Sequence, residues 1–316
     1  MNKLKVVLSL ITRDNDYQLE QAKTAEAVAH QHDVDLEIFY ADSESVTQSV
    51  QLLDAIHKYK AGLSAILVEP AGGTEFPQVG RAAVSAGIAW VVLNRDASSL
   101  ADLRRNFQTP AFAVSSDHKQ VGQIQAQQLA AILPQAAMVL CIEGPANTLA
   151  AQQRLVGLEG AKPPSITLKM LNSHNWTEEG GFHAVSSWLR LSTSQKQPIC
   201  AVAAQNDFIA IGARKGFEEA RLSLPGDPWS QLPFFGVDGV PHTGQAFVDR
   251  GLLAATVVVP PVAGPALEAV VKAITTKTVP PDLHLIPGYS YPAIESLRPN
   301  SSGRAPTGDA RQRPLA

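Results

Sequence analysis

Short apolar runs alternate with helical patterns along almost the whole chain, and the scheme begins again after about residue 116. The apolar runs are only four to nine residues long, and nearly every position in them is apolar. Between them, apolar residues recur at helical spacing, as Val46, Val50, Leu53 and Ile56 do over about 45–60. Strands of this kind, separated by helices, indicate parallel sheets covered on both faces. The predicted fold class is therefore α/β, with two doubly wound parallel-sheet domains.

The expected elements follow from these patterns. The expected strands are 4–11, 34–42, 64–70, 88–94 and 111–116, then 137–144, 165–171, 198–204, 232–237 and 252–259. The expected helices include 17–32, 45–60, 118–132, 147–161, 177–191, 207–221, 242–250 and 263–277. The Pro- and Gly-rich stretch 299–316 has the composition of a disordered tail.

Charge and hydropathy exclude two classes of partner. The net charge is −3 and no basic run occurs in the body of the chain, so we expect no nucleic-acid binding. No apolar stretch approaches the roughly 18 residues of a membrane span, so we expect no membrane insertion. The opening run KLKVVLSLI is too short for a signal peptide and leads directly into TRDND. The chain is therefore expected to be cytoplasmic, or periplasmic if a leader has been removed.

The sequence lacks the usual motifs of catalysis and of cofactor or metal binding. Neither a GxGxxG nor a GxxxxGK[ST] loop occurs, and HExxH and GxSxG are absent. We therefore expect no cofactor, no metal site and no enzyme activity. His174 and His183 are interpreted as solvated side chains. Cys141 and Cys200 lie in apolar strands and are interpreted as buried small hydrophobes, with a disulfide as the alternative if the two strands are neighbours.

Polar residues follow several of the strands and mark a possible binding site. The carboxyl ends of parallel strands line the ligand crevice of open α/β sheets. The segments TRDND, LVEP, VLNR, EGPANT, AAQND and GVDG would thus surround one cleft. Taken singly, each candidate has a structural alternative. Arg95 and Arg154 also suit a solvated surface, Trp176 suits a core and Asp238 suits a turn. For Asp207 we favour the role of helix N-cap.

These segments, in this order, carry a family resemblance over about residues 4–295. LDAIHKYKAGLSAILVEP, GIAWVVLNR, AVSSDH, QRLVGLEGA, AVAAQND, FFGVDG and GLLAATVVVPP resemble type I periplasmic sugar-binding proteins of the ribose-binding group. The same fold serves as the effector domain of lactose-repressor-type regulators. The resemblance implies two lobes joined by a three-segment hinge. The first lobe would comprise 1–113 and 260–282, and the second 114–259 and 283–298.

The resemblance also implies a set of ligand-contacting residues. The guanidinium groups of arginine would hold neighbouring hydroxyls. Side-chain amides would donate and accept hydrogen bonds, carboxylates would accept them, and aromatic faces would stack on a sugar ring. Carried over by position, the contacts are Asn15, Tyr17, Glu69, Asn94, Arg95, Arg154, Trp176, Asn206 and Asp238.

Three departures from the family pattern bear on the ligand. Glu69 stands where the family has Asn or Asp, Asn94 precedes Arg95 where the family has Asp, and Val259 stands where ribose binders have Gln. Glu69 would keep a strong acceptor or pair with Arg95, and Val259 would suit an apolar group of the ligand. We therefore expect a small carbohydrate or polyol other than ribose.

The expected function is the solute-binding component of an ABC-type sugar importer, closing by hinge motion over its ligand. Its partner would then be an ABC permease. A cytoplasmic sugar sensor without its own DNA-binding domain, acting on a partner protein, is the alternative. An enzyme on this fold is the third alternative.

Overall fold

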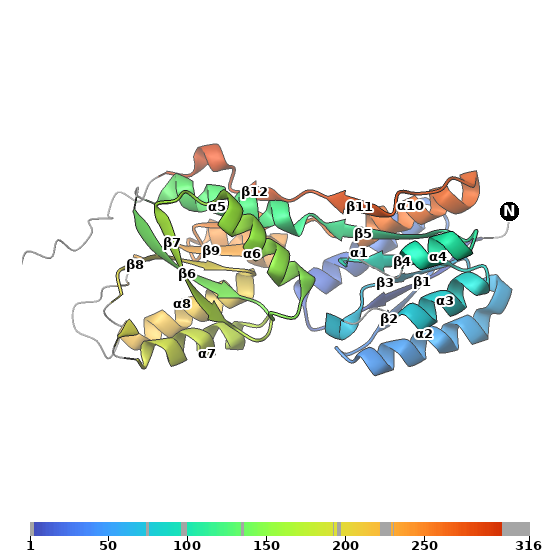
Figure 1. The fold of residues 1–316 in the computed structure, drawn as a ribbon, viewed down its shortest axis with the longest axis horizontal. Helices are drawn as coiled ribbons and strands as arrows, with labels where there is room; N and C mark the ends of the chain where they lie inside the picture. Colours follow the sequence, from blue (N-terminus) through green and yellow to red (C-terminus); the bar gives the residue numbers. More distant parts are fainter. Residues whose placement is uncertain are drawn as a thin grey trace, which may run out of the picture.

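Two lobes lie side by side along the long axis of the molecule, each built around its own sheet (Figure 1). The computed structural model describes residues 3–73, 76–95, 100–133, 136–191, 193–194, 197–221, 229 and 231–298. The predicted disordered tail, 299–316, lies outside these residues. Within them, each lobe has one six-stranded sheet.

The first sheet is wholly parallel, with strand order β11-β5-β4-β3-β1-β2. Helices α1 and α10 pack on one face, around Leu8 and Val91. Helices α2, α3 and α4 pack on the other, around Val7 and Trp90. Neighbouring strand residues thus enter opposite cores, which is why the central strands β3 and β4 are apolar throughout. The elements are β1 Lys5–Leu10, α1 Asp16–Gln31, β2 Asp35–Tyr40, α2 Ser45–Tyr59, β3 Ala65–Val68, α3 Pro77–Ser85, β4 Ala89–Leu93, α4 Leu100–Asn106, β5 Ala111–Ser116, α10 Ala263–Thr276 and β11 Leu283–Ile286.

The second sheet has the order β12-β10-β9-β8-β6-β7 and is parallel except where β12 joins β10. Helices α7 and α8 cover one face and α5 and α6 the other, so that Leu140 and Cys141 of β6 enter different cores. The elements are α5 His118–Ile132, β6 Ala137–Glu143, α6 Leu149–Ala161, β7 Ile166–Asn172, α7 Glu178–Leu189, β8 Ile199–Ala204, α8 Asp207–Arg221, β9 Phe234–Asp238, α9 Ala246–Asp249, β10 Ala255–Val258 and β12 Tyr289–Tyr291.

Most expected elements are present, with three additions and one change. Helix α4 and strands β11 and β12 were not expected. The two strands are short edge strands of mostly exposed or half-buried residues, so no continuous apolar run marks them. The helix expected over 242–250 is instead a π-helical turn, Pro241–Gln245, followed by the short α9.

The chain passes between the lobes three times: from β5 to α5, from β10 to α10, and from β11 to β12. The sequence-based division gave 283–298 to the second lobe, but β11 pairs with β5 of the first sheet. The third crossing therefore lies at Pro287 and Gly288, and the first lies at Asp117, after the whole of β5. The Asp117 backbone N donates to the Ile286 carbonyl at 2.9 Å, which ties two crossings together.

The two cysteines are free thiols. Their strands β6 and β8 are neighbours, but Cys141 lies opposite Ala203, three residues along from Cys200. That offset of roughly 10 Å is too long for a disulfide. Burial raises the pKa of the Cys141 thiol.

In the described part of the chain, no helix has the length and apolar character needed to cross a bilayer.

Candidate functional site

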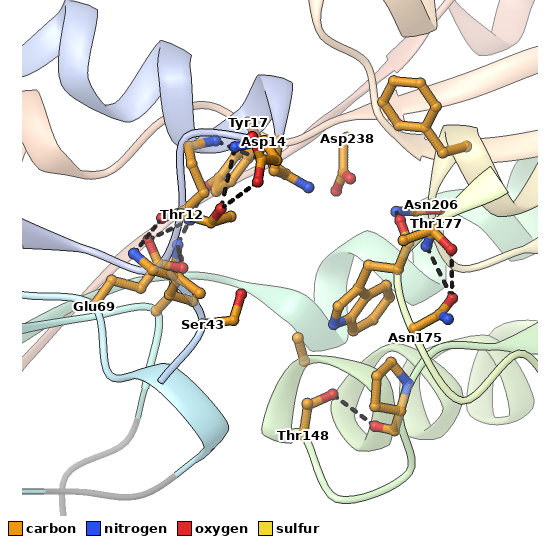
Figure 2. Close-up of a pocket in the computed structure, with 18 of the residues that line it drawn as sticks. Thr12, Asp14, Tyr17, Ser43, Glu69, Thr148, Asn175, Thr177, Asn206 and Asp238 are labelled. Carbon is orange, nitrogen blue, oxygen red and sulfur yellow. Dashed lines mark hydrogen bonds between the residues drawn. The ribbon is translucent and has the colours of Figure 1, made fainter. Parts of the chain in front are cut away.

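A cleft of about 530 Å³ lies between the lobes, where the carboxyl ends of the strands of both sheets meet. Figure 2 shows Thr12, Ser43 and Glu69 on one side, with Thr148, Asn175 and Asn206 facing them across the gap. The structure brings all the sequence-predicted contacts to this lining: Asn15, Tyr17, Glu69, Asn94, Arg95, Arg154, Trp176, Asn206 and Asp238.

Glu69 is the centre of a hydrogen-bond network inside the first lobe. Its Oε2 accepts from the side-chain amides of Gln18 at 2.9 Å and Gln21 at 3.2 Å. Its Oε1 accepts from Asn94 Nδ2 at 3.2 Å. The Asn94 Oδ1 in turn accepts from the Ser116 backbone N at 3.3 Å. Glu69 and Asn94 are therefore largely satisfied by their own lobe, and the two departures at these positions form one interacting pair.

Arg95 does not pair with Glu69. No ion pair joins these two described side chains, and the guanidinium instead donates to the carbonyls of Asn94 at 2.9 Å and Pro70 at 3.3 Å. Its buried Nε has no partner among the residues that the structure describes. Burial lowers the pKa of Arg95, and the charge of Glu69 opposes that effect. These two bonds use two of the five N–H donors of Arg95, which also lines the cleft.

Asn15 and Tyr17 come from the start of α1. Asn15 caps the helix, since its Oδ1 accepts from the Gln18 backbone N at 3.2 Å. The Tyr17 hydroxyl lies 3.4 Å from both Ser116 Oγ and the Pro260 carbonyl, and so contacts two hinge crossings. Burial, and next the charge of Glu69, raise the pKa of Tyr17, which keeps it a neutral phenol.

Arg154 organises the second-lobe wall. Its Nη1 donates to the Gln205 carbonyl, and its Nη2 lies 3.3 Å from Asp238 Oδ1. The guanidinium carbon lies 5.6 Å from the centre of the Trp176 ring. The buried Nε has no partner in the described part of the chain. Arg154 is 6% exposed, so it is a buried site residue rather than a solvated helix residue.

Trp176 both packs on the lobe core and lines the cleft. Its ring lies against Gly144, where an added Cβ would be 2.3 Å from the indole, so that this position requires glycine. Its backbone carbonyl accepts from Asn206 Nδ2 at 2.9 Å. The Asn206 Oδ1 accepts from the Ile209 backbone N at 2.7 Å. Asn206 therefore caps α8 and positions Trp176.

Asp238 ends β9 with a φ of +104°, which turns its carboxylate into the gap between the lobes (Figure 2). Burial raises the pKa of Asp238 to about 6, although Arg154 acts in the opposite direction. Asp238 is the acceptor that pairs with Arg154 at the cleft surface.

Asp207 is not the helix cap, so that interpretation was wrong. The cap of α8 is Asn206, one residue earlier. Asp207 is 3% exposed, and it accepts from the Gly239 backbone N at 2.8 Å and Thr256 Oγ1 at 2.6 Å. Burial, and next the charge of Asp238, raise the pKa of Asp207 well above its ordinary value. It joins α8 to the residue that follows β9 and to β10.

The structure also corrects the reading of two other positions. Val259 is 2% exposed and belongs to a small hinge core with Val121 and Val257, not to the cleft lining. His118, which the sequence reasoning missed, does line the cleft. Its sequence signal is its place two residues after the end of strand β5, in the segment AVSSDH at a hinge crossing. Among the described residues, no group of three or more His, Cys, Asp or Glu side chains could hold a metal ion.

Two parallel-sheet lobes, three crossings and a polar cleft at the facing strand ends define a two-lobe ligand-binding protein of the type I periplasmic binding fold. The family described as "Periplasmic binding protein domain" matches residues 6–277. The chain belongs to the periplasmic binding protein family, which confirms the fold class predicted from the sequence.

Individual relatives span nearly the whole chain. It is 25% identical over 292 residues to the galactofuranose-binding protein YtfQ of Escherichia coli (strain K12), covering 91% of this chain and 87% of that protein. It is similar to an ABC transporter periplasmic solute-binding protein of Actinobacillus succinogenes 130z with bound D-allose, at 25% identity, a TM-score of 0.78 and coverage of 91% and 97%. A third relative, at 21% identity and a TM-score of 0.74, is the arabinose-transporter component of Shewanella sp. ANA-3 bound to L-arabinofuranose, with coverage of 92% and 93%.

Proposed function

We propose that the chain binds one uncharged monosaccharide or polyol in its cleft, as the solute-binding component of an ABC-type sugar importer. The observation that carries the proposal is the pairing of Arg154 with Asp238 beside the Trp176 ring, opposite Arg95. The guanidinium N–H groups can donate hydrogen bonds to sugar hydroxyls, and the carboxylate can accept from them. The aromatic face can stack on the apolar side of a sugar ring.

The charge of the cleft supports an uncharged ligand. The cations Arg95 and Arg154 are matched by the carboxylates Glu69 and Asp238, and Asp14 and Glu178 add two further negative groups. An anionic ligand would therefore meet no net positive field. The volume of about 530 Å³ lies in the usual range for small-molecule sites. The relatives described as galactofuranose-binding and as holding D-allose point to the same class of ligand.

The binding part of the proposal is tested by thermal unfolding in the presence of D-allose, D-galactose, L-arabinose and myo-inositol. A ligand at 100 times its Kd should stabilise the wild type by about 2.7 kcal/mol. Asp238→Ala removes the acceptor and the partner of Arg154, so we expect it to abolish this stabilisation while leaving an unliganded folded state. A wild type that no sugar or polyol stabilises would contradict the proposal.

The transport part needs a cellular measurement. Deletion of the gene should abolish uptake of the stabilising sugar, and re-expression of the wild type, but not of Asp238→Ala, should restore it. Uptake that persists in the deletion strain, together with altered expression of sugar-responsive genes, would favour the sensor alternative.

A further inference from the structure

His118 is a buried cleft residue whose ring nitrogens have no hydrogen-bond partner among the described residues. It is the first residue of α5, directly past the crossing from the first lobe. The residue is 3% exposed, and within the described part of the chain neither Nδ1 nor Nε2 makes a hydrogen bond. Because buried polar groups are almost always hydrogen-bonded, an imidazole with both nitrogens unpaired in a cleft lining indicates that a ligand supplies the partners.

The surroundings of His118 hold it in the neutral form. Burial, and next the charges of Arg154 and Arg95, lower its pKa well below the ordinary value. The positive end of the α5 dipole also disfavours a cation at this position. A neutral imidazole has one donor nitrogen and one acceptor nitrogen, so it can receive a hydrogen bond from one hydroxyl and give one to another.

The amide and charged groups at the centre of the cleft leave this role open. Glu69 and Asn94 are bonded within the first lobe, and Asn206 is occupied by capping α8 and holding Trp176. The unpaired Nε atoms of Arg95 and Arg154 only donate. The Asp238 carboxylate only accepts. A ligand hydroxyl that must both give and receive a proton at the hinge side of the cleft finds both functions in His118.

We propose that His118 is a ligand-contacting residue that determines specificity, with its neutral imidazole bonded to two hydroxyls of the sugar or polyol. This inference rests on the proposed function. It implies that the ligand is held from the hinge crossing as well as from the two lobe walls, and that an analogue lacking one of these hydroxyls binds more weakly.

The test compares His118→Phe with the wild type, because phenylalanine keeps a planar ring and removes both nitrogens. Titration calorimetry would use whichever of D-allose, D-galactose, L-arabinose and myo-inositol stabilises the wild type. We expect affinity to fall about tenfold or more. The unliganded melting temperature should stay the same or rise, since two unpaired buried polar atoms are removed. His183→Phe, at an exposed histidine outside the cleft lining, is the matched control and should bind like the wild type.

Two outcomes separate this inference from the proposed function. If His118→Phe binds like the wild type while Asp238→Ala does not bind, His118 is only structural and the inference fails alone. If no probe binds the wild type, the proposed function fails and the inference fails with it. Should His118→Phe not fold, ¹⁵N NMR of the wild-type histidine rings decides. Both His118 ring nitrogens should shift on sugar addition, and unchanged resonances would overturn the inference.

Discussion

Two carboxylates in the second lobe, Asp207 and Asp238, have different roles because their surroundings differ: Asp207 is structural and Asp238 lines the cleft. Asp207 is enclosed, and it bonds to a backbone N and a hydroxyl of neighbouring strands. Asp238 lies at the cleft surface against Arg154. Burial raises the pKa of both groups, but only the carboxylate of Asp238 faces the space that a ligand would fill.

Sugar binding should therefore depend on the protonation of Asp238. The folded pKa of about 6 exceeds the ordinary 3.8, so the folded protein holds a proton at pH values where the unfolded chain has released it. The contribution of Asp238 to stability is then unfavourable above pH 6 and improves as the pH falls through 6 towards 4.

Affinity should change in the opposite sense, because a neutral carboxyl is a weaker acceptor and a weaker partner for Arg154. We expect the affinity for the sugar to fall roughly tenfold per pH unit below the pKa of Asp238. Titration calorimetry between about pH 5 and pH 8 measures this slope. Asp238→Asn should bind weakly without that slope, and an unchanged slope in this variant would assign the titration to another group.

At the scale of elements, the contact between α5 and α6 sets the position of Arg154. A Cβ built on Gly122 of α5 would lie 2.0 Å from the Arg154 carbonyl oxygen on α6. The two helices therefore approach as closely as their backbones allow, and any separation displaces the guanidinium. Helix α5 also begins with His118, so the α5–α6 pair carries two residues that line the cleft, His118 and Arg154.

Gly122→Ala should force these helices apart. We expect it to lower the free energy of unfolding by about 1–3 kcal/mol, as overpacking does, and to weaken sugar binding by moving Arg154. Chemical denaturation and titration calorimetry measure the two effects.

The control for that variant is Gly160→Ala on α6, where nothing lies within 4 Å of the added Cβ. Alanine is the better helix former, so this change should raise stability by up to about 1 kcal/mol and leave binding unchanged. Equal effects of the two substitutions would show that helix propensity, rather than the contact, explains the result.

At the scale of the molecule, the three crossings form one hinge. The Tyr17 hydroxyl contacts Ser116 and Pro260, and Gln120 Oε1 accepts from the Gly288 backbone N at 3.1 Å. A small apolar core with Val121 and Val259 lies among them. Polar residues of both lobes line the cleft, among them Arg95 of the first and Arg154 of the second, so a sugar bonded to both would draw the lobes together.

Small-angle scattering should therefore report a smaller radius of gyration when a stabilising sugar is added to the wild type. The change should saturate at the ligand concentration that saturates calorimetry. Asp238→Ala should keep the unliganded radius at the same sugar concentration. A wild type that binds sugar without any decrease would show that the cleft closes over its ligand by side-chain movement alone.

The sequence identifies the central strands of each sheet but not the edge strands β11 and β12. Central strands such as β4 and β8 are buried on both faces, so their composition alone identifies them. Edge strands β11 and β12 lack that signature, because one of their sides has no neighbouring strand and their residues stay partly exposed. The misplaced third crossing followed from missing these two strands.

The sequence by itself determined the α/β class, the two lobes and which strand ends carry polar side chains, because all of these follow from local patterns of apolar residues. Only the tertiary structure decided the partner of each polar group. Glu69 bonds to Gln18 and Gln21, Asp207 bonds to Thr256, and His118 remains unpaired beside two arginines. These contacts join residues about fifty positions apart or lie across a hinge crossing. No local pattern encodes such a choice, since it depends on which groups the packed lobes leave within reach of each other.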